Sequence, residues 1–308
     1  MSQSQFKPAY LLMEPDELAA RAASLREIMR ECRLCPRECR VDRLAGETGA
    51  CAVGAEPIVS SCGPHFGEEA PLVARHGSGT IFLAHCNLKC VFCQNYDISH
   101  LGRGTTSTIE NLADTMLDLQ RRGCHNINWV TPTHQVPMLV EAARLAAEKG
   151  LHLPIVYNCG GYESLEVLRL LDGIVDIYMP DAKYGDNETG LHLSGVPDYW
   201  DRNREALTEM HRQVGDLVLD DDGVATRGLL VRHLVLPNDL ARTTTVTEFI
   251  ASLSADTYIN VMAQYRPAHR AGEVTELARP ITPAEFRQAV QTALDAGLRR
   301  LDQRWAFL

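Results

Sequence analysis

The sequence predicts an α/β fold in which six strand–helix units build a parallel sheet, either an incomplete barrel or a doubly wound sheet. Short apolar segments that suit strands alternate with helical segments from about residue 78 onward. The strand segments are apolar throughout, as expected of strands that are buried on both faces. Such repetition favours parallel strands joined by right-handed crossovers. Residues 1–77 lack this rhythm, and we expect them to form an N-terminal extension packed on the sheet.

The predicted elements follow one another along the chain. We expect strands at 79–84, 127–131, 153–158, 174–180, 228–237 and 258–264. We expect helices at 14–32, 109–123, 136–150, 163–173, 204–215, 245–254 and 282–297, with a loop at 185–200. Thr282 and Glu285 form a capping box at the start of the last helix. The predicted organisation is an extension (1–77), a barrel (78–270) and a C-terminal helix with a tail (271–308).

Composition and charge exclude several classes of protein. The chain has 308 residues and a net charge of -10, which disfavours a nucleic-acid partner. No apolar run approaches the length of a membrane span, and the N-terminal sequence does not resemble a signal peptide. We therefore predict a cytoplasmic protein without a membrane partner. Thiols stay reduced in that compartment, so its ten cysteines suggest metal binding or catalysis before disulfides.

Three of these cysteines lie in eight residues, CNLKCVFC, directly after the first predicted strand. The spacing of Cys86, Cys90 and Cys93 arises by chance in roughly one such chain in a hundred. A structural zinc ion would need a fourth ligand, for which His85 or His100 is available. A redox pair would need only two thiols. A [4Fe–4S] cluster held by three thiolates would keep one iron open to a small molecule.

The segment GSGTIFLAHCNLKCVFCQNYDIS (77–99) resembles the radical S-adenosylmethionine (radical SAM) enzymes. It is most similar to their pyruvate formate-lyase activating enzyme-like branch, in the subgroup with an N-terminal CxxCPRxC segment. The likeness covers most of residues 30–270. It implies a partial, TIM-like (β/α)6 barrel, a [4Fe–4S] cluster on Cys86, Cys90 and Cys93, and SAM bound at the open iron. It also implies SAM cleavage to a 5′-deoxyadenosyl radical, with electrons from a flavodoxin- or ferredoxin-type donor.

The resemblance also suggests residues that contact SAM at the carboxyl ends of the strands. Phe92 occupies the aromatic position before the third cysteine, and the pair Asp181 and Lys183 matches a D-x-K pattern near SAM. The turn after the second strand departs from the usual GGE-type motif. Of Arg232 and His233, strand alternation lets only one point inward. The full set of SAM-contact candidates is Phe92, Asn95, Thr131, Thr133, His134, Asn158, Asp181, Lys183, Arg232 and Gln264.

Cys159 is the candidate catalytic residue. It ends the third predicted strand, before a Gly-Gly pair and outside both cysteine-rich segments. A thiol near a substrate radical can donate a hydrogen atom, because the S–H bond is weaker than C–H. The alternative is a small buried hydrophobic side chain.

A second set of four cysteines lies in the extension, at Cys32, Cys35, Cys39 and Cys51. Four thiols with a C-x₂-C opening suit a closed tetrahedral zinc site. They equally suit a second Fe–S cluster. Reduced cysteines also need not bind anything.

Three functions follow from these patterns. The favoured one is a redox-neutral change of a small molecule, such as epimerisation of a sugar, with Cys159 as the hydrogen-atom donor. The first alternative is an activase that generates a glycyl radical on a partner enzyme. The second alternative is a non-catalytic metal-binding module.

Overall fold

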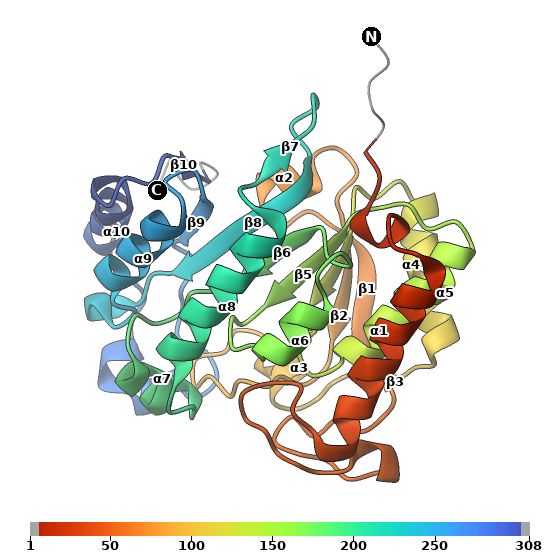
Figure 1. Ribbon diagram of the computed structural model, residues 1–308. Coiled ribbons are helices and arrows are strands. Elements are labelled where there is room, and N and C mark those ends of the chain that lie inside the picture. The colour runs from red at the N-terminus through yellow and green to blue at the C-terminus, as the bar shows by residue number, and fades with distance from the viewer. Residues whose placement is uncertain (1–5, 303–308) are drawn as a thin grey trace.

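The computed structural model, which describes residues 6–302, folds around one twisted sheet (Figure 1). The six predicted parallel strands cross this sheet in chain order, as β2 (Ser78–Leu83), β4 (Ile127–Val130), β5 (Ile155–Cys159), β6 (Ile177–Pro180), β8 (Ala225–Leu234) and β9 (Tyr258–Met262). Their order never reverses, whereas a doubly wound sheet has a point of reversal. The architecture is therefore the incomplete barrel. A short strand, β10 (Arg300–Leu301), pairs in parallel with β9 beyond them.

The predicted helices follow their strands and cover the outer face of the sheet. They are α4 (Ile109–Arg121), α5 (Val136–Glu148), α6 (Leu165–Leu170), α8 (Tyr199–Val214), α9 (Thr243–Leu253) and α10 (Pro283–Asp295). The capping box of α10 is confirmed, because Thr282 accepts from the Glu285 amide and Glu285 accepts from the Thr282 amide. Short 3₁₀ turns lie at Ala9–Leu11, Ile28–Glu31, Arg43–Ala45, Pro237–Asp239, Ala271–Glu273 and Thr275–Leu277.

The predicted loop at 185–200 is wrong, because it contains the helix α7 (Asn187–Ser194). Asp186 caps its first turn by accepting from the Thr189 amide at 2.6 Å, and Gly195 ends it in the left-handed conformation. Both are standard helix-end signals, but the helix between them is polar and short. The next helix, α8, begins at Tyr199 rather than at 204.

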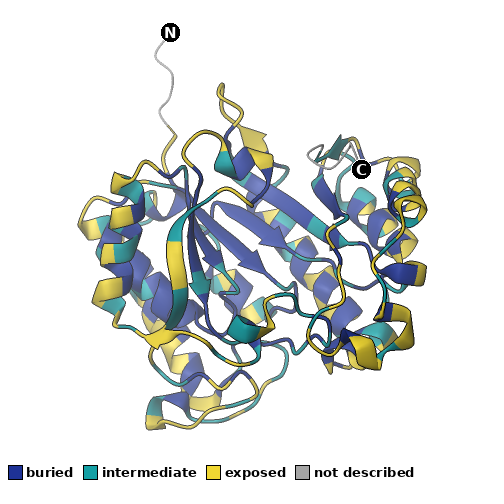
Figure 2. Ribbon diagram, turned by 180° about the vertical axis from the view of Figure 1, so that it is seen from behind, coloured by how far each residue is buried: buried dark blue, intermediate teal, exposed yellow. Residues whose placement is uncertain are grey.

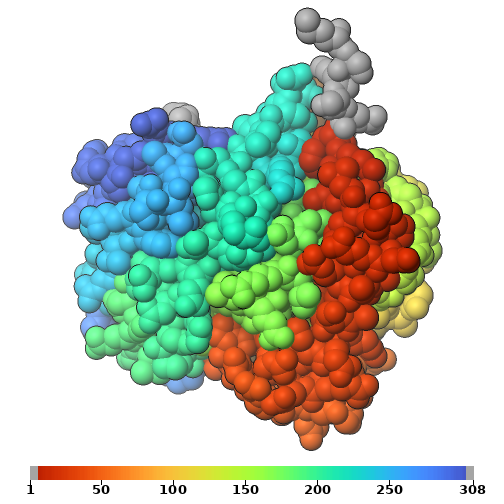
Figure 3. All heavy atoms as spheres, viewed as in Figure 1, coloured from red at the N-terminus to blue at the C-terminus, as the bar shows by residue number. Residues whose placement is uncertain are grey.

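The N-terminal segment contributes to the sheet as well as packing on it. Its helix α1 (Pro15–Glu27) lies against α5 and α6. Strand β1 (Ile58–His65) pairs antiparallel with β2, and β3 (Thr105–Thr106) pairs with β1. The expectation of a wholly parallel sheet was therefore wrong at this edge. In Figure 3 the N-terminal residues, red to orange, lie along the green middle of the chain.

Alternation along the strands divides the apolar core into two layers. Residues such as Ile81, Trp129 and Tyr157 face the outer helices and form the main cluster. Residues such as Val156 and Leu230 face the barrel interior, where Leu72 of α2 (Ala70–Val73) joins them. Figure 2 shows the buried strands between exposed outer helices. No helix among residues 6–302 is long and apolar enough to cross a membrane.

Candidate active site and cysteine-rich segments

The candidate site lies at the end of the barrel where the parallel strands finish. The three-cysteine loop connects β2 to α3 (Tyr96–Ser99). Helices α3 and α7 lie at this end of the molecule, whereas α2 and β7 (Val218–Leu219) lie at the opposite end (Figure 1). The carboxyl ends of parallel strands are where barrel folds carry their chemistry. The loop is therefore placed as the sequence predicts.

Each of the three loop thiols accepts or shares a hydrogen bond. The Leu88 amide donates to Cys86 Sγ at 3.3 Å, and Ser194 Oγ on α7 donates to Cys90 Sγ at 3.0 Å. Cys93 Sγ lies 3.1 Å from Ser99 Oγ. Ser194 is a residue that the sequence interpretation missed, because it lies in the stretch that was expected to be a loop.

The electrostatics of this loop fit a thiolate-ligated group. Burial raises the pKa of the Cys86 thiol to about 12; Cys90 adds to the rise and Lys183 opposes it. A buried sulfur of this kind becomes a thiolate when a metal centre binds it. The Lys183 charge acts on Cys86 and Cys93, and the Cys90 charge acts on Lys183, so the loop thiols and this ammonium face the same end of the barrel. Within residues 6–302, no three or more metal-ligating side chains are already drawn together in metal-holding geometry.

The histidines considered as a fourth zinc ligand have other positions. The His100 ring nitrogen Nε2 lies 3.1 Å from the Cys90 carbonyl, and the ring packs on His269 with centroids 4.3 Å apart. His85 has a left-handed backbone, with φ at 67°, and its ring lies against Gly102. These positions do not favour the zinc alternative for this loop.

Four of the predicted SAM contacts meet in one half-buried network inside the barrel. Asp181 pairs with Lys183 and, at 2.9 Å, with Arg232, while Arg232 also donates to Asn158 Oδ1 at 2.6 Å. Burial alone raises the pKa of Asp181, but the charges of Arg232 and Lys183 outweigh it and lower the pKa. The expectation that Arg232 and His233 face opposite sides is confirmed, because His233 contacts the Ala182 carbonyl and Thr243 instead.

Glu68 and Glu69 complete this network from the side of α2. The sequence interpretation missed both residues. Glu68 Oε2 accepts from Asn158 at 3.4 Å, and Glu69 Oε1 accepts from Asn260 at 2.8 Å. Burial raises the pKa of Glu69, and the Arg232 charge opposes the rise. The only sequence signal was an adjacent Glu-Glu pair in a segment expected to be an extension. The segment enters the barrel because β1 joins the sheet.

Three acceptor atoms inside the barrel lack a hydrogen-bond partner among residues 6–302. They are Glu69 Oε2, Asn128 Oδ1 and Asn260 Oδ1. All three residues are at least nine-tenths buried. Unpaired buried acceptors are costly, so such a group favours a polar ligand or water that donates to them.

The remaining SAM-contact candidates do not join the network. Phe92 packs edge-on against Tyr184 and Tyr265 in a buried aromatic cluster. Thr133 donates to Glu163 at 2.8 Å, and the His134 ring lies 2.9 Å from the Ala84 carbonyl. The exposed candidates are Asn95 and Gln264.

Thr131 is the one candidate with an unusual backbone. Its φ is 61°, which a β-branched residue rarely adopts, and its amide donates to the Asn158 carbonyl at 2.8 Å. The turn after β4 is therefore held against the neighbouring strand, beside the network.

Cys159 does not face the barrel interior. It ends β5 next to Asn158, which points inward to Arg232, so alternation directs Cys159 to the opposite face. Its side chain belongs to the main core cluster, and its thiol bonds to the Glu163 carboxyl. This position favours the alternative of a small buried side chain.

The four cysteines of the extension lie around one small cavity. Cys32, Cys35, Cys39 and Cys51 line one small cavity with Arg43, Asn87 and His134. Asn87 follows Cys86 directly, so this second set lies beside the three-cysteine loop. All ten cysteines are free thiols.

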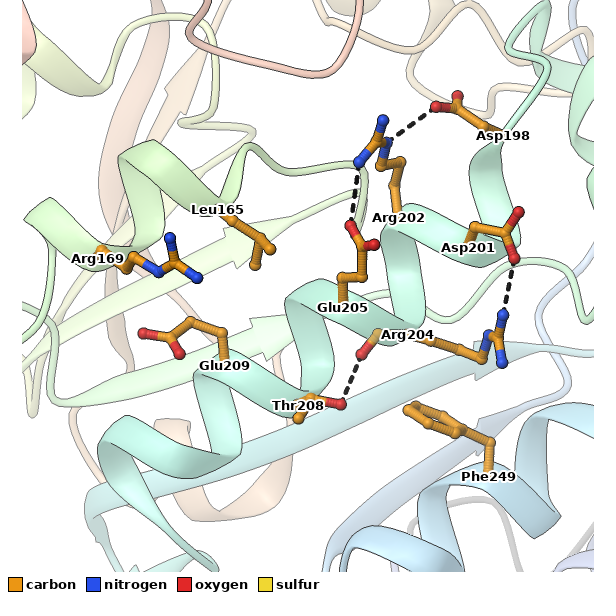
Figure 4. A pocket seen from close by; sticks show the side chains of 10 residues that line it. All are labelled: Leu165, Arg169, Asp198, Asp201, Arg202, Arg204, Glu205, Thr208, Glu209 and Phe249. Atoms are coloured by element: carbon orange, nitrogen blue, oxygen red, sulfur yellow. Dashed lines mark hydrogen bonds and ion pairs between the residues drawn. The ribbon is translucent and has the colours of Figure 1, made fainter.

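A wide surface hollow lies elsewhere, on the outer face of α6 and α8 (Figure 4). Its volume is about 730 Å³. The charged side chains that line it pair among themselves, Arg202 with Asp198 and Glu205, and Arg204 with Asp201. It is outside the barrel and contains no cysteine, so we do not assign the chemistry to it.

The fold and the loop together define a class: incomplete (β/α) barrels with a C-x₃-C-x₂-C loop after the first parallel strand. The family model of the radical SAM superfamily matches residues 80–220. The uncharacterized protein MJ0674 of Methanocaldococcus jannaschii is 32% identical over 290 residues, covering 91% of this chain and 79% of that protein. The chain therefore belongs to the radical SAM superfamily, whose cofactors are a [4Fe–4S] cluster and SAM.

The chain also has more distant similarities to one named enzyme and to two solved structures. The pyruvate formate-lyase-activating enzyme of Listeria monocytogenes is 24% identical over 205 residues, covering 62% of this chain and 75% of that enzyme. Streptococcus suis SuiB bound to S-adenosylmethionine has a TM-score of 0.49 at 12% identity; the match covers 68% of this chain but less than half of SuiB, 45%. Methylornithine synthase (PylB) has a TM-score of 0.43 at 13% identity, covering 95% and 79%. TM-scores this low carry no argument.

Proposed function

We propose that Cys86, Cys90 and Cys93 hold the cluster of this radical SAM enzyme, and that a small polar substrate binds inside the barrel. The observation that supports this most directly is the position of Lys183. Its charge opposes the rise in the pKa of the Cys86 and Cys93 thiols, and its ammonium is paired with the half-buried Asp181. Bound there, the cluster and SAM supply a 5′-deoxyadenosyl radical that removes a hydrogen atom from the substrate.

The buried charges suggest how this chain orients SAM. Arg232 and Lys183 supply two cations, and Asp181 supplies one carboxylate that bridges them. The methionine part of SAM carries an ammonium and a carboxylate, which need one partner of each sign. Because Asp181 bonds to both cations, it also keeps these charges fixed in place.

The substrate class follows from the acceptors below this network. Glu69, Asn128 and Asn260 each present an oxygen without a donor among the described residues. A hydroxylated or amino-bearing small molecule, such as a sugar, would supply the donors. This supports a small molecule as substrate.

Epimerisation with Cys159 as hydrogen-atom donor stays a prediction, and it requires a change in the orientation of the Cys159 side chain. The thiol would have to turn from the core cluster to the barrel interior. If the Cys159→Ala variant still inverts its substrate with normal deuterium uptake from D₂O, Cys159 is not the hydrogen-atom donor.

A glycyl-radical activase is the second candidate function. The relative named as a pyruvate formate-lyase-activating enzyme favours it. Its test is anaerobic incubation of the reduced enzyme and SAM with purified pyruvate formate-lyase, followed by EPR. A glycyl radical signal would support the activase, and its absence would leave the small-molecule proposal as the stronger one.

The direct test of the proposed function is formation of 5′-deoxyadenosine. The anaerobically reconstituted protein is incubated with SAM and dithionite, and the product is measured by chromatography and mass spectrometry. We expect 5′-deoxyadenosine from the wild type and from the control Cys62→Ala, whose thiol is exposed on β1. Cys90→Ala should fall to the background without protein. A wild type that yields none would favour the non-catalytic module.

A further inference from the structure

The four cysteines of the extension surround a cavity of very limited size. Cys32, Cys35, Cys39 and Cys51 line it, and its volume is about 10 Å³. That is about the room for one water-sized sphere. A cluster of four irons and four sulfides would need several times that space.

Each sulfur of this set faces an N–H donor. Cys35 accepts from the Arg37 amide and Cys51 from the Val53 amide, each two residues further along the chain. The Ala50 amide donates to Cys39 Sγ at 3.4 Å. These donors would hydrogen-bond to the sulfurs when a metal ion holds them as thiolates.

A buried cation beside the thiols gives an independent indication. The Arg43 side chain is 1% exposed, and its Nη1 lies 4.0 Å from Cys32 Sγ. The other hydrogen bonds of this guanidinium reach the carbonyls of Gly54 and His134. Among the described residues no carboxylate forms an ion pair with it. A buried charge needs an opposite charge, and thiolates would supply it.

We propose that Cys32, Cys35, Cys39 and Cys51 bind a single divalent metal ion of zinc-like chemistry rather than a second Fe–S cluster. Four thiolates close a tetrahedral coordination shell, which is the arrangement of structural zinc sites. Such a site carries two excess negative charges, and Arg43 offsets one of them. The cavity has room for about one ion, and the side chains of residues 32–51 would have to close further around it, since no three ligating groups among residues 6–302 are yet in metal-holding geometry.

The position of the site assigns it a structural role next to the three-cysteine loop. Arg37, between Cys35 and Cys39, donates to the carbonyls of Asn87, Ser194 and Gly195. Asn87 neighbours Cys86, and Ser194 donates to Cys90. A metal ion that orders residues 32–51 would therefore fix the Arg37 contacts that hold this loop.

Metal analysis of a variant without the other cysteine set tests the proposal. The triple variant Cys86→Ala, Cys90→Ala and Cys93→Ala is purified without oxygen and without added metal. We expect about one zinc per chain and no iron. Adding Cys35→Ala and Cys51→Ala should remove the zinc. The matched control adds Cys62→Ala and Cys124→Ala, which lie outside the cavity, and should keep it.

A second measurement covers variants that fail to fold. Wild-type protein is treated with a thiol-specific mercurial in the presence of a zinc-sensitive dye, and about one zinc should be released per chain. Replacing the ion with Co²⁺ should give the intense visible bands of a tetrahedral cobalt–thiolate centre. Iron retained by the triple variant, protein without metal, or a disulfide within the set would each overturn the proposal. Loss of zinc in the matched control would do the same.

Discussion

Arg232 shows at the residue scale how one side chain serves both stability and the site. It is half-buried, bonds to Asp181 and Asn158, and feels the charges of Glu68 and Glu69. The attraction of these carboxylates outweighs burial and keeps its charge, since its pKa is raised. Removal of this cation would leave Asp181 with Lys183 as its remaining partner and would take the donor from Asn158 Oδ1.

We therefore predict that Arg232→Met lowers the free energy of unfolding by about 3–5 kcal/mol. Asp181→Asn should have a similar effect, and the double variant should cost less than the sum of the two. Urea unfolding measures all three. The matched control is Arg242→Met, whose partner Asp186 and own side chain are far more exposed. Its cost should stay below about 1 kcal/mol. Equal costs for the two arginines would contradict this interpretation.

At the scale of the secondary-structure elements, Glu163 links strand β5 to the turn after β4. Its carboxylate accepts from Thr133 after β4 and from Tyr157 on β5, at 2.8 and 2.9 Å. Burial raises its pKa from 4.5 to about 7, although these donors oppose the rise. The folded protein thus holds a proton that the unfolded chain has already released in this pH range.

Stability should depend on pH through this residue. As pH rises from about 4.5 to about 7, the unfolded state ionises first, so the Glu163 contribution to stability falls and then levels off above 7. The free energy of unfolding of wild type minus that of Glu163→Gln should decrease over this window. Chemical unfolding at pH 4.5, 6 and 8 measures the difference. If this difference in the free energy of unfolding stays constant or rises with pH, the raised pKa of Glu163 is contradicted.

The sequence predicted the parallel strands well because each is an apolar run buried on both faces. Strand β1 was missed because its residues, IVSSCGPH, mix polar and apolar positions, and its pairing with β2 is decided by tertiary contact. The helix α7 was missed because its signal rests on Asp186 and Gly195 rather than on an apolar stripe.

The N-terminal segment is part of the barrel at the scale of the whole molecule. Its β1 extends the sheet, Glu69 bonds to Asn260 inside it, and the Ala9 amide donates to the buried Asp176 at 2.7 Å. Removal of the segment would expose the β2 edge and leave inward polar groups unpaired.

A chain that begins at residue 78 should therefore fail to fold into a stable monomer. We expect loss of a cooperative thermal transition in circular dichroism and aggregation in size-exclusion chromatography. A chain that begins at residue 6 is the control and should unfold like the full-length protein. Cooperative unfolding of the shorter chain at the same midpoint would show that the extension is an independent part.

The candidate site was predictable only where chemistry and spacing coincide. Three cysteines after a strand identify a cluster loop from sequence alone, and the D-x-K pair follows from strand alternation. Glu68 and Asn260 could not be assigned, because they are separated along the chain and meet only when β1 closes against the sheet. Phe92 and His134 stay predictions as SAM contacts, because their packing and hydrogen-bond partners within the protein do not test that role.

The central claim is that Cys86, Cys90 and Cys93 leave one iron open for SAM. The most direct test is electron–nuclear double resonance on the reduced protein with SAM labelled with ¹⁵N at the amino group and ¹⁷O at the carboxylate. We predict hyperfine couplings from both labels to the cluster in the wild type and no cluster signal in Cys90→Ala. A wild-type cluster that shows no coupling to either label would contradict the account.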